Sequence, residues 1–261
     1  MSTNQALIDF QNIRVMRGSK PVLDDFTLRI SSNEHVAILG PNGCGKSTLI
    51  KTITRECYPI NREESSMKIL GNDHWNVFEL RTMLGIESND LISECTGQAL
   101  GRDAVLSGFF SSANIFSNHI VEPAQRKLAD AALERLQIAH LAKRPVREMS
   151  SGEVRRILIA RALVHQPKAL LFDEPSNSLD VFARHTVRQT MSQLARSGVG
   201  IILVTHDLGD IIPDIERVVL MSNGKIVADG SKQEMLKPER LKELFGIEVE
   251  IAHKNGHYHT W

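Results

Sequence analysis

The chain has 261 residues, with 31 Lys and Arg against 31 Asp and Glu, so its formal net charge is zero. Its 42% of hydrophobic and 24% of charged residues are typical of a soluble globular protein and exclude a disordered chain. A neutral chain has no overall field to attract nucleic acid or acidic lipid, so we expect neither as a direct partner. No apolar stretch approaches the roughly 20 residues that cross a bilayer, no secretory signal is found, and the 3 cysteines lack metal-ligand spacing. We therefore expect a cytoplasmic protein.

The N-terminal part of the chain predicts two strands, a further buried strand and a helix. Residues 8–30 alternate between apolar and polar side chains around a turn at 18–21, which indicates an antiparallel pair. Residues 36–39 are a short apolar run of the buried-strand type. A glycine-rich loop follows at 40–45, and apolar residues at helical spacing begin at Leu49.

The middle of the chain predicts a mostly helical insertion over about residues 79–146. Leu128, Ala132 and Leu136 have helical spacing, and Pro123 precedes them at a position that the first turn of a helix tolerates. The apolar residues of this segment have helical spacing, whereas the segments on both sides contain the short apolar runs that are typical of strands.

Strands and helices alternate again after the insertion. The apolar runs 169–172 and 200–204 each follow a helical pattern, which favours a parallel, doubly wound sheet. Residues 218–228 predict a hairpin with a primed turn at Asn223 and Gly224. The fold class is therefore predicted as α/β.

The glycine-rich loop matches the pattern G-x-x-x-x-G-K-[ST], in which backbone N–H groups hold phosphates at a helix N-terminus. Lys46 would supply charge to the β- and γ-phosphates, and the Ser47 hydroxyl would be a ligand of Mg²⁺. A glycine-rich turn without a ligand is the alternative, and the strand, loop and helix context argues against it. The expected ATP-binding residues are Gly40, Pro41, Asn42, Gly43, Cys44, Gly45, Lys46, Ser47 and Thr48.

Two carboxylates end the apolar run at 169–172. Asp173 would hold Mg²⁺ through water, and Glu174 would be the general base for the attacking water. Taken alone, such a pair is usually no more than the end of a strand. The pair indicates a catalytic site only because the chain also contains the phosphate loop.

A second anion site is predicted where Ser150, Ser151 and Gly152 open a helix that reaches Leu163. Such a helix start presents N–H groups and the positive end of the helix dipole. Two phosphate-binding helix ends in one chain require an explanation.

The order of these motifs, continued by 176–180 and by Thr205, His206 and Asp207, resembles an ATP-binding cassette (ABC) ATPase over residues 5–230. The resemblance implies a RecA-like P-loop NTPase core with an antiparallel β subdomain and an inserted α-helical subdomain. In finer detail, residues 158–163 and 212–216 resemble stand-alone cassettes of the molybdenum-transport or photorepair type.

The resemblance also implies domain boundaries. The nucleotide-binding domain would span 5–240, with its core in 5–78 and 147–240 around the insertion, and a tail would follow at 241–261. The histidines of the tail lack helical spacing, so we expect a mobile segment that holds no metal.

In that family, two cassettes sandwich each ATP between the phosphate loop of one and the signature of the other, which the resemblance places at Ser-Ser-Gly-Glu, residues 150–153, in this chain. The resemblance therefore places Asp180 at the dimer seam and His206 on the γ-phosphate; a satisfied buried histidine is the alternative for His206. The residues implied to act on the partner's ATP are Ser150, Ser151, Gly152, Glu153 and Asp180.

Two positions depart from the family pattern. Arg17 stands where an aromatic residue usually stacks on adenine; a guanidinium can also stack on a base, and a solvated hairpin residue is the alternative. Asn89 stands where a Gln usually reaches the metal and the attacking water, and Gln98 is a less favoured substitute. We expect Asn89 to keep a catalytic and metal-binding role.

The resemblance implies a Mg²⁺-dependent ATPase that pairs with a second cassette, most simply a second copy. Two classes of function remain. In the first, the pair drives an ABC transporter through membrane-spanning permease subunits and lies at the inner face of the membrane. In the second, it is a soluble ABC ATPase in assembly, repair or ribosome-associated work.

Overall fold

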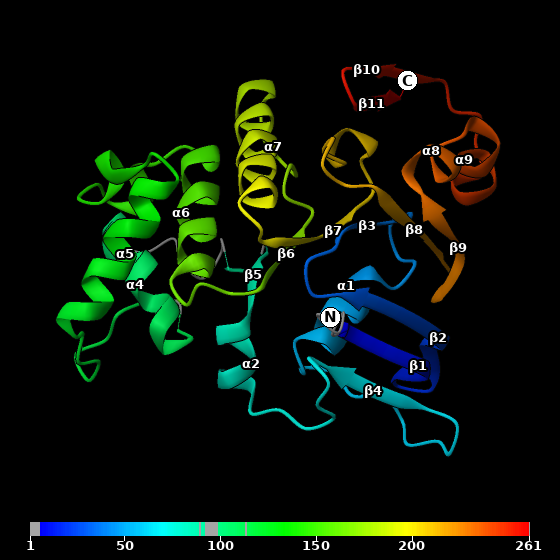
Figure 1. Ribbon diagram of the computed structural model, residues 1–261, viewed down its shortest axis with the longest axis horizontal. Coiled ribbons are helices and arrows are strands. Elements are labelled where there is room, and N and C mark those ends of the chain that lie inside the picture. Colours follow the sequence, from blue (N-terminus) through cyan, green and yellow to red (C-terminus); the bar gives the residue numbers. More distant parts are fainter. Residues whose placement is uncertain (1–5, 89, 92–98, 113, 261) are drawn as a thin grey trace, which may run out of the picture. The chain divides into compact units, whose positions relative to one another are not determined.

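The structure is a computed structural model (Figure 1) that describes residues 6–88, 90–91, 99–112 and 114–260. The chain divides into two compact units: unit 1 consists of Met1–Leu80 and Gly200–Trp261, and unit 2 of Arg81–Val199. Within the described ranges, no helix is both long and apolar enough to cross a membrane.

Unit 1 contains an antiparallel sheet of β1 (Ala6–Arg17), β2 (Lys20–Ser31) and β4 (Ser66–Ile69), in the order β2-β1-β4. In β2, the buried residues from Phe26 to Ile30 alternate with exposed ones, as a period of two requires. In β1, Leu7 and Ile8 are both buried, and the register with β2 shifts at several points. The predicted antiparallel pair is confirmed, with Arg17 opposite Lys20 at the turn.

A second sheet of unit 1 runs in the order β7-β3-β8-β9. β3 (His35–Leu39) is parallel to β7 (Gly200–Thr205) and to β8 (Arg217–Ser222), and β9 (Lys225–Ser231) is antiparallel to β8. The carboxyl ends of β3 and β7 therefore lie at one edge. The primed turn between β8 and β9 is confirmed by positive φ angles at Asn223 (48°) and Gly224 (74°).

Helix α1 (Lys46–Ile53) follows β3 in unit 1 and buries Leu49, Ile50 and Ile53. Its position directly after the loop confirms the predicted order of strand, glycine loop and helix (Figure 1).

The end of the chain forms α8 (Lys232–Met235), α9 (Pro238–Phe245) and a hairpin of β10 (Ile251–Lys254) and β11 (His257–Thr260), where the sequence predicts a mobile tail. Tyr258 on β11 is buried, and its ring stacks on His253 of the paired strand β10, with ring centroids 4.5 Å apart. Residue Gly256 lies close against Pro213 in the same unit.

Unit 2 combines a parallel pair of strands with helices. β5 (Leu84–Glu87) pairs with β6 (Ala169–Asp173), so that Glu87 lies opposite Phe172. The helices are α2 (Val77–Met83), which leads into this unit, α4 (Gly101–Leu106), α5 (Pro123–Arg135), α6 (Ser151–Leu163) and α7 (Val181–Arg196), with 3-10 turns at Ser107–Phe110, Ala139–Leu141 and Val146–Glu148.

The sequence signals for α5 and α6 are confirmed. Pro123 occupies the first turn of α5, whose buried residues are Ala129, Ala132 and Leu133. Helix α6 ends at Leu163, as predicted, and nine of its residues are buried because it packs against α4, α5 and α7. A helix covered on so many sides is held firmly at its N-terminus.

Candidate functional site

The phosphate loop of unit 1 begins directly after β3. The N–H of Gly40 donates to the carbonyl of Thr205 over 3.3 Å. A Cβ on Gly40 would lie 2.3 Å from the carbonyl oxygen of Met221, so glycine is required there. Gly43 (φ 80°) and Gly45 (φ 112°) take left-handed backbone conformations that other residues rarely adopt. The loop shape therefore depends on glycine at all three positions.

The N-terminus of α1 is open to an anion. Its N-cap is Gly45, which has no side chain to accept a hydrogen bond from the first turn. The first N–H groups of a helix have no intrahelical acceptor, so they point to whatever lies beyond the end. Ser47 is exposed and Thr48 half-buried on that turn.

Lys46 is folded over its own loop. Its side chain is buried, and Nζ donates to the carbonyl oxygens of Gly40 (2.7 Å) and Pro41 (3.1 Å). The ammonium group thus lies above the loop backbone at the start of α1. A phosphate that enters this loop meets a positive charge and helix N–H groups together.

The turn between β8 and β9 supports the loop from its other side. The N–H of Gly224 donates to the carbonyl of Cys44 over 2.8 Å, and the N–H of Asp24 donates to the carbonyl of Gly224 over 3.1 Å. The sequence predicts Gly224 as a turn residue, but nothing in its neighbourhood signals a contact with a loop so distant in the chain. The thiol-bearing side chain of Cys44 is itself buried.

His206 follows β7 and is exposed. Thr205, which is fully buried, shapes the turn: its Oγ1 accepts from the N–H of Asp207 (3.0 Å) and donates to Oδ2 of Asp210 (3.2 Å). Because the carbonyl of Thr205 also accepts from the N–H of Gly40, the structure places His206 and the phosphate loop at one edge of the sheet.

Arg17 lies at the end of β1 with an exposed side chain. Arg17 lies at the tip of the β1–β2 hairpin, which agrees with the alternative that it is a solvated hairpin residue. Exposure also leaves the guanidinium accessible to a base.

In unit 2, the two carboxylates lie where β6 ends. The strand is buried from Ala169 to Phe172, and Asp173 and Glu174 are both half-buried. Glu174 has a φ of 51°, which a residue with a side chain adopts at a cost of about 1–3 kcal/mol. Strain of this kind is concentrated at functional positions.

The helix start at Ser150 is capped by its own residues. Ser150 Oγ accepts from the N–H of Glu153 (3.3 Å), and the N–H of Ser150 donates to Glu153 Oε2 (2.7 Å). Glu153 also pairs with Arg144 over 3.0 Å. Burial opposes the ionisation of Glu153, but the hydrogen bonds from Ser150 and the charge of Arg144 outweigh it and lower its pKa. The capping box leaves the N–H groups of Ser151 and Gly152 at the helix end.

The start of α7 lies beside the start of α6. A Cβ on Gly152 would be 2.7 Å from the Cβ of Ala183, so the two helices touch there. Asp180 is the N-cap of α7, since its carboxylate accepts from the N–H of Ala183 over 2.8 Å. Asp180 is therefore near the predicted signature, and it remains exposed.

A buried ion pair of unit 2 has no signal in the local sequence. Arg155 on α6 donates to Glu87 at the end of β5 over 2.8 Å, and both side chains are almost inaccessible. Burial raises the pKa of Glu87 to about 7, and the nearby guanidinium of Arg155 opposes that rise. The predicted catalytic residue Asn89, two positions further on, lies outside the described residues, as does Gln98.

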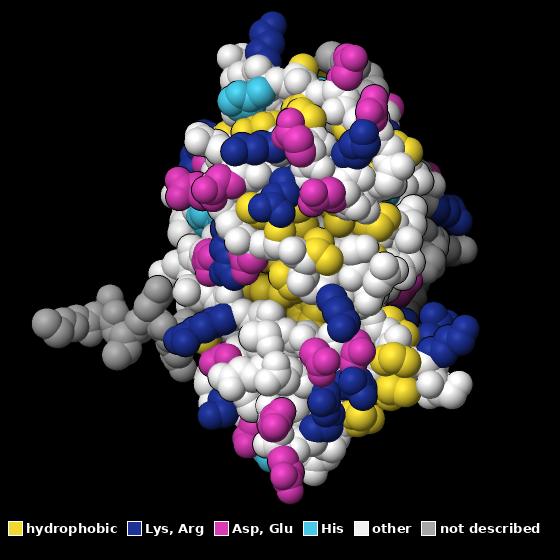
Figure 2. Space-filling view, turned by 90° about the vertical axis from the view of Figure 1, so that its right-hand side faces the viewer, with side chains coloured by type: hydrophobic (Ala, Val, Ile, Leu, Met, Phe, Trp, Pro, Cys, Tyr) yellow, Lys and Arg dark blue, Asp and Glu magenta, His cyan; other side chains and the backbone are white. Residues whose placement is uncertain are grey.

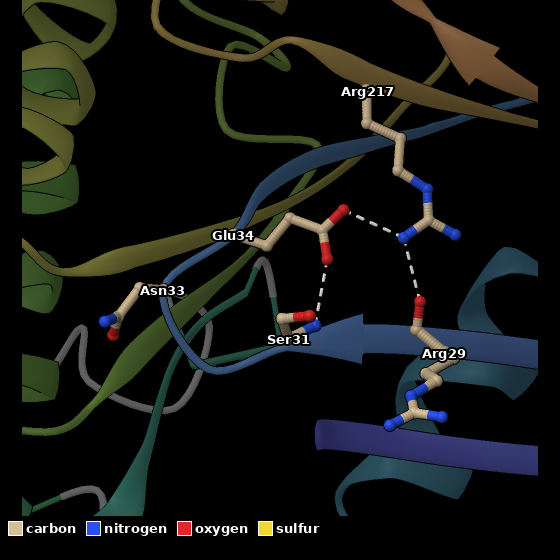
Figure 3. Close-up of a pocket in the computed structure, with 5 residues that line it drawn as sticks. All are labelled: Arg29, Ser31, Asn33, Glu34 and Arg217. Atoms are coloured by element: carbon tan, nitrogen blue, oxygen red, sulfur yellow. Dashed lines mark hydrogen bonds and ion pairs between the residues drawn. The ribbon is translucent and has the colours of Figure 1, made fainter. Parts of the chain in front are cut away.

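A shallow pocket of unit 1 is lined by Arg29, Ser31, Asn33, Glu34 and Arg217 (Figure 3). Arg217 Nη1 donates to Glu34 Oε1 and to the carbonyl of Arg29, each over 2.8 Å, and Nη2 reaches Asp229 over 2.6 Å. These contacts connect β8 to β9 and to the end of β2. We interpret the pocket as part of this structural network.

Charge is mixed on the face of the molecule in Figure 2, where basic and acidic side chains lie next to one another. No large area of this face carries charges of one sign only. This agrees with the balance of 31 basic and 31 acidic residues.

Comparisons with known proteins match these features. The family model described as ABC transporter fits residues 23–177, more than half of the chain. The hemin import ATP-binding protein HmuV of Aliivibrio fischeri is 30% identical over 262 residues, which cover 94% of this chain and 93% of that protein. The spermidine/putrescine import ATP-binding protein PotA of Haemophilus influenzae is 32% identical over 242 residues, 89% of this chain and 60% of PotA.

Among solved structures, cbiO1 of Clostridium perfringens, part of the ABC transporter complex cbiONQ, is similar with a TM-score of 0.77. The sequence identity is 25%, and the match covers 92% of this chain and 94% of cbiO1.

Gly224→Ala is expected to weaken ATP binding. Its Cβ would lie 2.2 Å from the carbonyl oxygen of Val22, so the turn that supports Cys44 must move. Gly246→Ala is the matched control, because Gly246 at the end of α9 has the same positive φ (74°) but has nothing within 4 Å of the added Cβ. Both variants should lose about 1–3 kcal/mol of stability from backbone strain. Titration calorimetry with ATP should show a loss of affinity for Gly224→Ala alone; equal affinities would contradict the supporting role of this turn.

Proposed function

The chain belongs to the ABC transporter family of ATP-binding proteins, and on that premise we propose that two copies of it sandwich two ATP molecules with Mg²⁺ and drive import through separate membrane subunits. As a member of this family it binds ATP and hydrolyses it. The observation that carries the proposal is the phosphate loop, where a glycine backbone leads into the uncapped start of α1 beneath the buried Lys46.

Binding of ATP begins with an exchange of hydrogen bonds at Lys46. Its Nζ leaves the carbonyls of Gly40 and Pro41 and donates to β- and γ-phosphate oxygens, which are stronger acceptors. The N–H groups of the first turn of α1 donate to the same phosphates. Arg17 stacks on the base from the tip of its hairpin.

Magnesium, when bound, would neutralise the negative charge that develops on the transferred phosphoryl group. The Ser47 hydroxyl on the first turn of α1 would be a ligand of Mg²⁺, and the Asp173 carboxylate at the end of β6 would hold the ion through water, since Mg²⁺ prefers oxygen donors. Asn89 is the further ligand that we propose. The donor types present therefore fit the ion.

Proton transfer is the task that we assign to Glu174. Its carboxylate accepts a proton from the water that attacks the γ-phosphorus, and the left-handed backbone holds it beyond the end of β6. His206 donates a hydrogen bond to a γ-phosphate oxygen from the exposed turn after Thr205.

The second copy completes each site. The chain holds one phosphate loop and one signature, so a pair of chains supplies two of each. Because Glu153 and the side chain of Ser150 are engaged in the capping box, the N–H groups of Ser151 and Gly152 are the donors that we propose for the partner's γ-phosphate. Asp180 lies beside them at the seam, where it caps α7.

Import is proposed because both relatives described above are import ATP-binding proteins. Their cargoes differ, hemin for one and spermidine or putrescine for the other, although both resemble this chain to a similar degree. We therefore assign the choice of cargo to the membrane subunits, and this chain to the inner face of the membrane.

Glu174→Gln is expected to bind ATP and lose hydrolysis by about a hundredfold or more, because the amide cannot accept the proton of the attacking water. The variant should then accumulate as an ATP-bound dimer. Lys46→Ala should lose ATP binding itself, since it removes the charge over the loop. Hydrolysis is measured by phosphate release, and the dimer by size-exclusion chromatography with light scattering.

The control for these variants is Glu134→Gln, which removes a carboxylate from the exposed side of α5 and should change neither quantity. A Glu174→Gln protein that hydrolyses ATP at the wild-type rate would remove Glu174 from the role of base.

Affinity purification of the chain from solubilised native membranes tests the transport role. We expect a polytopic membrane protein to co-purify, with two cassettes for each complete translocation pathway. The same purification with Lys46→Ala should retain it, because docking does not need ATP. Recovery of soluble partners alone would favour a soluble ABC ATPase.

A further inference from the structure

Arg155 and Glu87 form a deeply buried ion pair in unit 2. Nη1 of Arg155 donates to Oε1 of Glu87 over 2.8 Å, with the two side chains 1% and 0% exposed. Burial of two charges costs as much as their attraction returns, and apolar side chains of the same volume would stabilise a fold equally well. Stability alone therefore does not explain why a charged pair lies at this position.

Arg155 also reaches a third segment. Its Nη2 donates to the carbonyl of Asn177 over 3.3 Å. Asn177 belongs to the turn that begins at Glu174, because its own N–H donates to the carbonyl of Glu174 over 3.1 Å. One guanidinium thus connects α6, the end of β5 and the turn after β6.

Each of these three segments leads to a residue of the proposed site. Helix α6 starts with Ser151, one turn before Arg155. Strand β5 ends at Glu87, two positions before Asn89. The turn after β6 runs from Glu174 to Asp180. Movement of one segment against the others would displace Asn89 or Glu174, which act on the chain's own ATP, or the start of α6, which acts on the ATP of the partner.

We propose that Arg155 is a positioning residue, which fixes the start of α6 relative to the end of β5 and the turn from Glu174 to Asn177. This inference rests on the proposed function, since it concerns how the signature and Glu174 are presented. An arginine suits the task because its planar group carries two separate NH₂ arms in a fixed fork, one for Glu87 and one for the carbonyl of Asn177. A lysine has a single ammonium group and no such fork.

The decisive variant replaces both partners, Arg155→Met with Glu87→Leu, so that no charge remains buried alone and the fold is retained. We expect ATP affinity and KM to stay within about twofold of the wild-type values, while kcat falls about 10- to 100-fold from misplacement of the reacting groups. In the Glu174→Gln background the same pair of changes should weaken the ATP-bound dimer.

Two single variants complete the test. Arg155→Lys retains a positive charge beside Glu87 without the second arm, so its kcat should lie between the wild type and the double variant. Arg161→Met is the matched control on the same helix, because Arg161 contacts Ser107 and Ser112 instead (3.1 and 3.0 Å). It should lower the melting temperature and leave kcat unchanged.

A folded double variant with the kcat of the wild type would overturn the positioning role, as would Arg155→Lys with full activity. The proposed function is judged separately, by whether Glu174→Gln alone forms an ATP-bound dimer. If it forms and the Arg155 variants behave as the wild type, only the inference about Arg155 fails. If it does not form, the action of the signature on a partner fails, and this inference fails with it.

Discussion

A triphosphate needs several N–H donors that converge on it, and a protein backbone provides them where a helix begins without a side-chain cap. Helix α1 meets this condition because its N-cap is Gly45, with a φ of 112°. Three of the six residues of this loop are glycines, which leave the backbone free to adopt many conformations, so hydrogen bonds from its surroundings must fix its shape. Thr205 binds it at Gly40, and Gly224 binds it at Cys44. The parallel strands β3 and β7 and the β8–β9 hairpin therefore act as the frame of one anion site.

Helix α6 has a different kind of N-terminus. Its capping box satisfies one N–H within the chain and orders the first turn, which leaves Ser151 and Gly152 as donors to an outside group. Its rotation is fixed by close contact with α7 at Ala183 and by Arg155, so this end is held before any ligand arrives. Each chain thus has a phosphate loop at the uncapped start of α1 and a signature at the capped start of α6. Pairing of two chains would bring the phosphate loop of one together with the signature of the other.

Local patterns account for what the sequence predicts well. The phosphate loop, the β1–β2 pair, the primed turn at Gly224 and the extent of α6 depend on residues close in the chain. Contacts between distant residues have no such signal: Glu87 and Arg155 are 68 positions apart, and the support of Cys44 by Gly224 joins two turns far apart in sequence. The hairpin near the C-terminus is not predicted, and the burial of Tyr258 in it depends on residues distant in the chain. The roles of Asn89, His206 and Asp180 remain predictions from resemblance, and those of Lys46 and Glu174 remain predictions from the local motifs.

The central claim is that the phosphate loop of one chain works with the signature of another, and a mixture of two inactive chains tests it most directly. Lys46→Ala removes the loop charge, and Ser151→Glu places a negative charge at the exposed start of α6, where it repels phosphate without harm to the helix. Each variant alone should be inactive. Their equimolar mixture should regain about one quarter of the wild-type ATPase rate, because half of the pairs are mixed and each mixed pair has one intact site. A mixture that stays inactive, although mixed dimers are detected in it by mass spectrometry, would contradict the account.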